Sequence, residues 1–142
     1  MKFVAASATA LSIIATAGAL RAEPGTASHR VFACALGAKS VSVTASGNQL
    51  VYSFGTAAHT ELRVVASASR KNVFFRTDRY AGPQQQLRFV NGAYSYIVYS
   101  MAGNAETEAQ SVSGLVVTKD GKKVADMPCS TYSELGGGFD YE

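Results

Sequence analysis

The chain has 142 residues, of which 47% are hydrophobic, and a formal net charge of +3. This length suits one domain with one hydrophobic core. Residues 1–22 hold two of the 13 basic side chains and no acidic one, so the rest of the chain has 11 basic against 10 acidic side chains. So small a net charge excludes nucleic-acid binding on electrostatic grounds.

The N-terminal stretch has the layout of a signal peptide, because Met1-Lys2 is followed by an uncharged run at 3–20. A transmembrane anchor would need about 20 strongly apolar residues, whereas this run is rich in Ala, Ser, Thr and Gly. A lipid anchor would need a Cys directly after the run, which is absent. We therefore expect a signal peptide at 1–22, cleaved after Ala19 or Ala22, and a mature protein that is periplasmic or secreted and not bound to a membrane.

Short runs of β-forming residues follow one another through the mature chain, separated by turn residues at intervals of roughly 8–12 residues. No helical period is sustained over about ten residues. The pattern predicts strands at 29–35, 39–45, 49–54, 60–66, 73–76, 112–119 and 122–127, and a hairpin of two strands within 85–100. The longer loops are expected at 67–72, 77–83 and 101–110.

The hairpin within 85–100 is the clearest element, because Asn91-Gly92 suits a two-residue type I′ turn. The pairs that this turn places on one face are Phe89–Tyr94, Leu87–Tyr96 and Gln85–Val98. The other face carries Ile97 and Tyr99. We expect a second sheet or a barrel wall to bury these two side chains; the alternative is an open face, where aromatic residues can stack on sugar rings.

The predicted fold class is all-β, with a single antiparallel β-barrel or curled β-sandwich of about eight to nine strands in residues 23–129. An immunoglobulin domain usually has a Trp between its cysteines, and this chain contains no Trp. Closure into a barrel would hide most sheet edges. A meander that closes or curls is therefore the expected architecture.

The two cysteines lie near the two ends of the expected β-domain, Cys34 in its first strand and Cys129 after its last. Two thiols in an oxidising compartment usually pair. The bridge would enclose 94 residues, for which loop entropy predicts about 4.5 kcal/mol. The alternatives are a reactive thiol, or a metal site with His29 and His59 as further ligands. We expect a terminal disulfide and no metal.

Residues 130–142 differ in composition from the strands. They contain Gly136-Gly137-Gly138, and Glu134, Asp140 and Glu142 make them acidic. Glycine runs do not hold regular structure cheaply. We expect a flexible acidic tail; the alternative is a short segment that docks on a basic surface.

Catalytic motifs are absent from the sequence. Hydrolysis needs a nucleophile with a base, or two carboxylates across a cleft, and no Gly-x-Ser-x-Gly, Ser-x-x-Lys or His-Glu-x-x-His occurs. No glycine-rich phosphate loop precedes a predicted helix. We therefore expect no enzyme and no cofactor. An enzyme would need a pocket where His59 or Asp78 meets a second titratable group.

Positive charge gathers between 61 and 90, where six basic side chains stand against Glu61 and Asp78. Most of them lie in or beside the loops 67–72 and 77–83. If the strands that flank these loops are neighbours, the loops lie at opposite ends of the strand between them. The candidate partner-binding residues are Ser67, Ser69, Arg70, Lys71, Arg79 and Tyr80. The alternative is ordinary solvated charge.

The layout resembles a family of small exported bacterial β-proteins without an assigned function. The matching features are Cys34, Tyr52-Ser53-Phe54-Gly55, Asn91-Gly92-Ala93-Tyr94-Ser95-Tyr96 and Cys129. They span nearly all of the mature chain. This resemblance implies the fold and export.

A weaker resemblance is to the periplasmic inhibitors of C-type lysozyme. It implies a small β-barrel with a terminal disulfide and a Ser-Gly-containing loop that enters the lysozyme cleft. Ser67-Ala68-Ser69 followed by Arg70 stands where that loop would lie, and Arg70 and Val73-Phe74 stand in place of the family's Gly and Tyr.

The expected function is that of a non-catalytic exported binding protein of the bacterial envelope, in its most concrete form lysozyme-inhibitor-like. Its partner would be a protein or an envelope glycan, and the protein would be a monomer. The alternatives are a structural or stress-related periplasmic protein and an uncharacterised enzyme.

Overall fold

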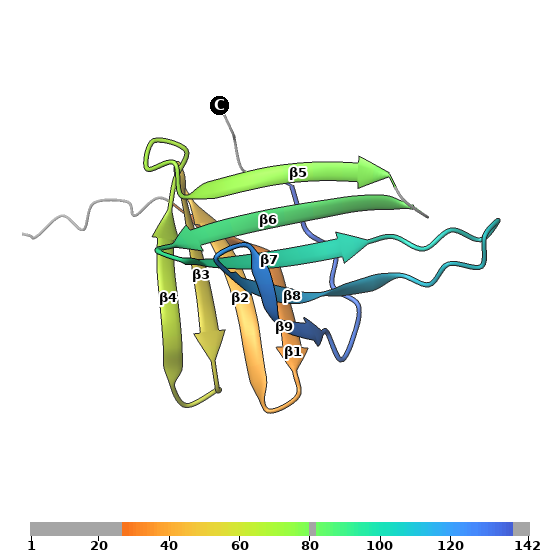
Figure 1. Ribbon diagram of the computed structural model, residues 1–142, viewed down its shortest axis with the longest axis horizontal. Coiled ribbons are helices and arrows are strands. Elements are labelled where there is room, and N and C mark those ends of the chain that lie inside the picture. The colour runs from red at the N-terminus through yellow and green to blue at the C-terminus, as the bar shows by residue number, and fades with distance from the viewer. Residues whose placement is uncertain (1–26, 80–81, 138–142) are drawn as a thin grey trace, which may run out of the picture.

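The structure is a computed structural model that describes residues 27–79 and 82–137. These residues form nine antiparallel strands in two sheets (Figure 1), so the all-β prediction is confirmed. The strands are β1 (Ser28–Leu36), β2 (Lys39–Ser46), β3 (Gln49–Gly55), β4 (Thr60–Ala66), β5 (Val73–Arg79), β6 (Pro83–Asn91), β7 (Tyr94–Met101), β8 (Val112–Lys119) and β9 (Lys122–Pro128). The expected signal peptide at 1–22, Tyr80 and residues 138–142 lie outside the described part of the chain.

Each sheet is a meander in which consecutive strands are hydrogen-bonded neighbours. The first sheet has the order β1-β2-β3-β4 and the second the order β5-β6-β7-β8-β9. Gly37, Gly47 and Gly121 lie in tight turns with φ of 74°, 58° and 77°. A Cβ disfavours this left-handed conformation, so glycine at these three positions helps to place the hairpin turns.

The two sheets are separate layers and do not close into a barrel. Strand β4 pairs with β3, strand β5 pairs with β6, and no strand pairing joins β4 to β5. The barrel alternative is therefore wrong. The segment 67–72 carries the chain from one layer to the other, so that β5 begins a new sheet whose strands cross those of the first steeply (Figure 1). Twisted sheets can pack around a shared core in this way without closing.

The core lies between the two layers and follows from the period-two alternation of the strands. Val41 and Val43 of β2 face Leu87 and Phe89 of β6 across the interior, and all four are at most 1% exposed. Tyr52 of β3 lies among them, with its ring centroid 5.4 Å from that of Phe89. The buried faces of both sheets therefore form one continuous core.

The central hairpin has a different register from the predicted one. Its pairs are Phe89–Tyr96, Leu87–Val98 and Asn91–Tyr94. Gly92 has a φ of 60°, whereas Ala93 is not among the residues with positive φ. A turn centred on Gly92-Ala93 needs positive φ only at its first central position, as in type II′. The register is therefore two residues away from the prediction, which leaves every side chain on its predicted face.

The expected burial of Ile97 and Tyr99 by a second layer is wrong. The first sheet packs on the face of β6 and β7 that carries Phe89 and Tyr96, as the 5.3 Å contact between the Tyr52 and Tyr96 rings shows. Side chains one position along a strand point to the opposite face. Ile97 and Tyr99 therefore lie on the outer face of the second sheet, partly exposed.

Strand β5 continues to Arg79, beyond the end predicted at 76. Thr77, Asp78 and Arg79 pair with Gln85, Gln84 and Pro83, so most of the loop expected at 77–83 is part of the β5–β6 ladder. Pro83 is the first residue of β6, a place where a missing N–H is tolerated. The cross-strand partners therefore override the strand-breaking residues.

The disulfide between Cys34 and Cys129 is present, with a Cα–Cα distance of 5.5 Å, as predicted. The first part of the segment expected as a flexible tail, residues 130–136, makes contacts with β1 and the core. Ser130 and Gly136 donate backbone hydrogen bonds to the carbonyls of Ala35 and Val31 on β1. Leu135 is 3% exposed and packs in the core. Residues 130–136 thus cover the outer edge of β1, and an exposed edge strand is an aggregation hazard that such cover removes.

No helix within the described ranges has the length and apolar character needed to cross a membrane.

Candidate functional site

The first candidate surface is the segment 67–72, named here the cationic loop, which links β4 to β5. Its turn is closed by the Lys71 N–H, which donates to the Ala68 carbonyl over 3.0 Å. The Ser67 hydroxyl accepts the Arg70 N–H at 3.3 Å and lies 3.0 Å from the Ser69 hydroxyl. Serine side chains commonly hold turns in this way.

Asn72 clamps the base of the cationic loop. Its side-chain oxygen accepts the Ser67 N–H at 3.1 Å, and its side-chain nitrogen donates to the Val65 carbonyl at 3.1 Å. Its backbone carbonyl accepts the Val90 N–H from β6 at 2.8 Å. The loop is therefore tied by hydrogen bonds to both sheets.

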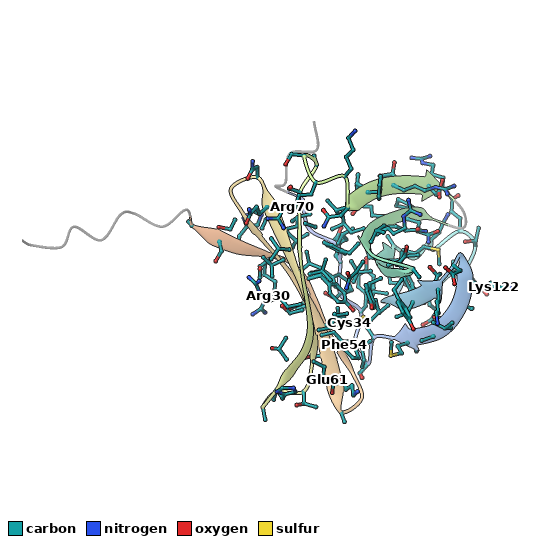
Figure 2. The ribbon with its side chains drawn as sticks, turned by 60° about the vertical axis from the view of Figure 1, so that its left-hand side comes forward. Arg30, Cys34, Phe54, Glu61, Arg70 and Lys122 are labelled. Carbon is teal, nitrogen blue, oxygen red and sulfur yellow. A yellow bond between two sulfur atoms is a disulfide. The ribbon has the colours of Figure 1, made fainter. Side chains whose placement is uncertain are left out.

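Arg70 and Lys71 lie at this tip and are exposed, and the Arg70 guanidinium also donates to the Val65 carbonyl over 3.5 Å. Figure 2 places Arg70 at one end of the first sheet and Glu61, near the start of β4, toward its opposite end. Lys71 has a φ of 54°, an uncommon conformation for a residue with a Cβ. Two cations thus share a rigid tip, which suits an acidic recess in a partner.

The predicted partner-binding residues that the structure describes do not form one site. Ser67 is 5% exposed, so it supports the loop and cannot be a principal contact. Arg79 ends β5 and the cationic loop precedes it, so a strand of seven residues, about 20 Å, separates them. Tyr80 is outside the described residues. The structure therefore brings together Ser67, Ser69, Arg70 and Lys71 only.

The second candidate surface is the side of the second sheet that faces away from the first sheet, named here the outer face. An open face carrying Ile97 and Tyr99 was the alternative to their expected burial. Its side chains stand in two cross-strand rows. One row is Phe74, Arg88, Ile97, Val116 and Asp126; the other is Arg76, Gln86, Tyr99, Gly114 and Pro128. Five strands at a spacing of about 4.8 Å make each row about 19 Å long.

Two hollows lie along these rows. One has a volume of about 430 Å³ and is lined by Phe74, Phe75, Arg76, Gln86, Arg88 and Ile97. The other has a volume of about 270 Å³ and is lined by Gln84, Gln86, Ile97, Tyr99, Val116 and Asp126. Because Gln86 and Ile97 line both, the two hollows adjoin and form one trough across the outer face.

Tyr99 lies over Gly114 in the neighbouring strand. A Cβ at Gly114 would stand 2.8 Å from the Tyr99 hydroxyl and 2.6 Å from the Met127 carbonyl oxygen. Burial, and then the charge of Asp126, raises the pKa of Tyr99 above its ordinary value, while Lys123 opposes the rise. The lone glycine inside a predicted strand was the sequence signal for this close approach.

Some charged side chains of the outer face have an ion-pair partner and one does not. Lys123 pairs with Asp126 at 2.9 Å and Arg76 with Asp78 at 2.6 Å. Arg88 instead lies over the Phe74 ring, 4.7 Å from its centroid, and has no carboxylate partner among the described residues. The trough therefore has one free cation at its β5–β6 end.

Neither of the residues named for an enzyme meets a second titratable group that would serve catalysis. Asp78 is paired with Arg76, and His59 lies in the β3–β4 turn, where its N–H and carbonyl bond to Thr56. Across residues 27–79 and 82–137, no group of three or more His, Cys, Asp or Glu side chains could hold a metal ion.

Comparison of the chain with models of protein families, with curated proteins and with solved structures finds no match.

Proposed function

We propose that this protein is a non-catalytic binding protein whose cationic loop enters an acidic cleft of a protein partner. The observation that supports the proposal is the preorganisation of the loop, in which Ser67 and Asn72 hold the tip by side-chain hydrogen bonds. A loop that is already ordered loses little conformational entropy on binding, so more of its contact energy is kept as affinity.

The most concrete form of the proposal is inhibition of a C-type lysozyme, whose cleft would receive Arg70 and Lys71. Two exposed cations at one tip accelerate association with a negatively charged cleft and fix its register. The partner would thus be recognised by sign of charge and by the shape of the turn.

The test is a titration of C-type lysozyme activity with the purified mature protein. We expect inhibition at nanomolar to micromolar concentration, and an inhibition constant about tenfold or more higher for Arg70→Ala/Lys71→Ala. The matched control is Arg30→Ala/Lys122→Ala, which removes two exposed cations elsewhere on the molecule (Figure 2). No inhibition by the wild type would end the lysozyme form, and an equal loss in both double variants would contradict the role of the loop.

A second variant separates loop rigidity from loop charge. Asn72→Ala removes the hydrogen bonds to the Ser67 N–H and the Val65 carbonyl but changes no charge. We expect weaker inhibition with an unchanged dependence on ionic strength, whereas Arg70→Ala/Lys71→Ala should reduce that dependence. An Asn72→Ala variant that inhibits like the wild type would contradict preorganisation.

We also propose that the mature protein works in the periplasm or outside the cell. Its Cys34–Cys129 bridge supports this, because disulfides persist in oxidising compartments. Intact-mass measurement of protein from the periplasmic fraction should find a chain that begins at Leu20 or Glu23. A chain that keeps Met1 and stays in the cytoplasm would contradict export.

A further inference from the structure

We propose that the trough on the outer face binds a saccharide that carries a carboxylate, with Arg88 as its anion-binding residue. None of the residues that line the trough belongs to the cationic loop, and the proposal does not depend on the proposed protein partner. The proposal depends on three features of the outer face, which are a free cation, an apolar and aromatic floor, and amide side chains between them.

The free cation is Arg88, which the ladder places between Phe74 and Ile97. An arginine that lies over an aromatic ring is held in place by that ring while its N–H edge remains available. A carboxylate is the complementary partner, because it accepts two parallel N–H bonds from one guanidinium. Arg76, two residues along β5 from Phe74, lines the same hollow, but its charge is paired with Asp78, so Arg88 is the residue assigned to the anion.

The floor is suited to the apolar face of a sugar ring. Ile97, Val116 and the Tyr99 ring line the second hollow and are partly exposed. Tyr99 is held over Gly114, so no rearrangement is needed to present its ring. A preformed surface of this kind binds without the cost of ordering side chains.

The third feature of the trough is a pair of side-chain amides that could hydrogen-bond to the hydroxyls of a sugar. Gln84 and Gln86 project from β6 into the trough, Gln86 on the wall that both hollows share. Each amide offers a donor and an acceptor, the pair that neighbouring sugar hydroxyls need. A fully apolar ligand would leave Arg88 and both amides unpaired, and desolvating unpaired polar groups costs affinity. The charge and the amides together thus favour an acidic saccharide.

The test uses ligands that differ only in charge. Tetragalacturonate carries its carboxylate on the ring, N-acetylmuramic acid carries it on a lactyl ether, and the methyl ester of each keeps the ligand but removes the negative charge. Calorimetric titration should show at least tenfold tighter binding of one acid than of its ester. The acid that binds shows whether the site prefers a carboxylate on the sugar ring or one on a lactyl ether. Absence of binding by both acids, or equal binding of acids and esters, would overturn the proposal.

Variants then locate the site. Arg88→Gln should weaken binding of the acid about tenfold and leave binding of the ester unchanged, whereas Tyr99→Leu should weaken both. The control is Arg63→Gln, which removes an exposed cation from the outer side of the first sheet. An equal loss with Arg63→Gln would mean diffuse charge attraction and would overturn the assignment. Arg88→Gln should inhibit lysozyme like the wild type, so failure of one proposal is distinguishable from failure of the other.

Discussion

Within residues 27–79 and 82–137, Tyr52 is the most completely buried aromatic residue that carries a polar group. It is 1% exposed and contacts the rings of Phe89 and Tyr96. Its hydroxyl has no hydrogen-bond partner among the described residues. Burial, followed by the neighbouring Tyr96, raises the pKa of Tyr52 well above its ordinary value. The folded protein therefore holds this hydroxyl neutral at the centre of the core.

We expect Tyr52→Phe to change the free energy of unfolding by less than about 1 kcal/mol near pH 8, because it removes a hydroxyl without a partner and keeps the ring. The wild type should lose stability as pH rises above about 10, since the unfolded tyrosine then ionises while the folded one does not. The Tyr52→Phe variant should lose less stability over the same rise in pH. Urea unfolding at about pH 8 and about pH 11 measures both effects, and equal alkaline losses would contradict the assignment.

Gly114 is a second single residue that matters for packing, because Tyr99 and the Met127 carbonyl occupy the space where a side chain would lie. Gly114→Ala would force its Cβ against the Met127 carbonyl and the Tyr99 ring. Overpacking of this kind should lower the free energy of unfolding by about 1–3 kcal/mol. Gly137→Ala is the matched control, because its Cβ would meet nothing within 4 Å. Thermal unfolding compares the two, and equal melting temperatures would contradict the crowding at Gly114.

At the scale of elements, the segment after the disulfide joins the two sheets. The Ser133 and Leu135 N–H groups donate to the hydroxyls of Ser113 and Ser100, which are buried on β8 and β7. The Gly136 N–H donates to the Val31 carbonyl on β1. Those two serines would otherwise be polar groups left inside an apolar core. This segment is thus a structural part of the β-domain.

Leu135→Ala should therefore lower the free energy of unfolding by about 2–5 kcal/mol, as for other leucines removed from a core. The control is Glu134→Ala, an exposed neighbour whose loss should change stability by about 0.5 kcal/mol or less. Chemical denaturation of the two variants decides the matter. Equal stabilities would mean that the segment is dispensable.

At the scale of the whole molecule, one covalent bond joins β1 of the first sheet to the end of β9 of the second. Cys34 and Cys129 are 95 positions apart in sequence. No strand pairing links the two sheets, so the core, the disulfide, the cationic loop and the segment 130–136 hold the layers together. The bridge restricts the unfolded chain over most of the domain.

Cys34→Ser/Cys129→Ser should lower the free energy of unfolding by about 2–5 kcal/mol, with the long loop favouring the upper part of that range. Wild-type protein treated with a reductant should show the same loss. Thermal unfolding with and without reductant measures it, and a melting temperature that does not respond to reductant would contradict a structural role for the bridge.

The strands and turns were largely predictable because they depend on local chemistry. Alternation in β2 and β3, and glycine at the tight turns, place strand bounds within one or two residues of those observed. The error at β5 arose because its cross-strand partners on β6 extend the ladder through Asp78 and Arg79. Likewise, the hairpin register depended on which two residues form the turn, which side-chain alternation alone does not specify.

By itself, the sequence determined the all-β class, most strand bounds, the disulfide pair and the apolar face of the central hairpin, since these follow from period-two alternation, turn residues and the pairing of two thiols. The tertiary structure alone decided that β4 and β5 belong to different sheets, that residues 130–136 pack on β1, and that Ile97 and Tyr99 lie on an open face. These depend on which layer covers which face, and such long-range packing leaves no periodic signal in the chain.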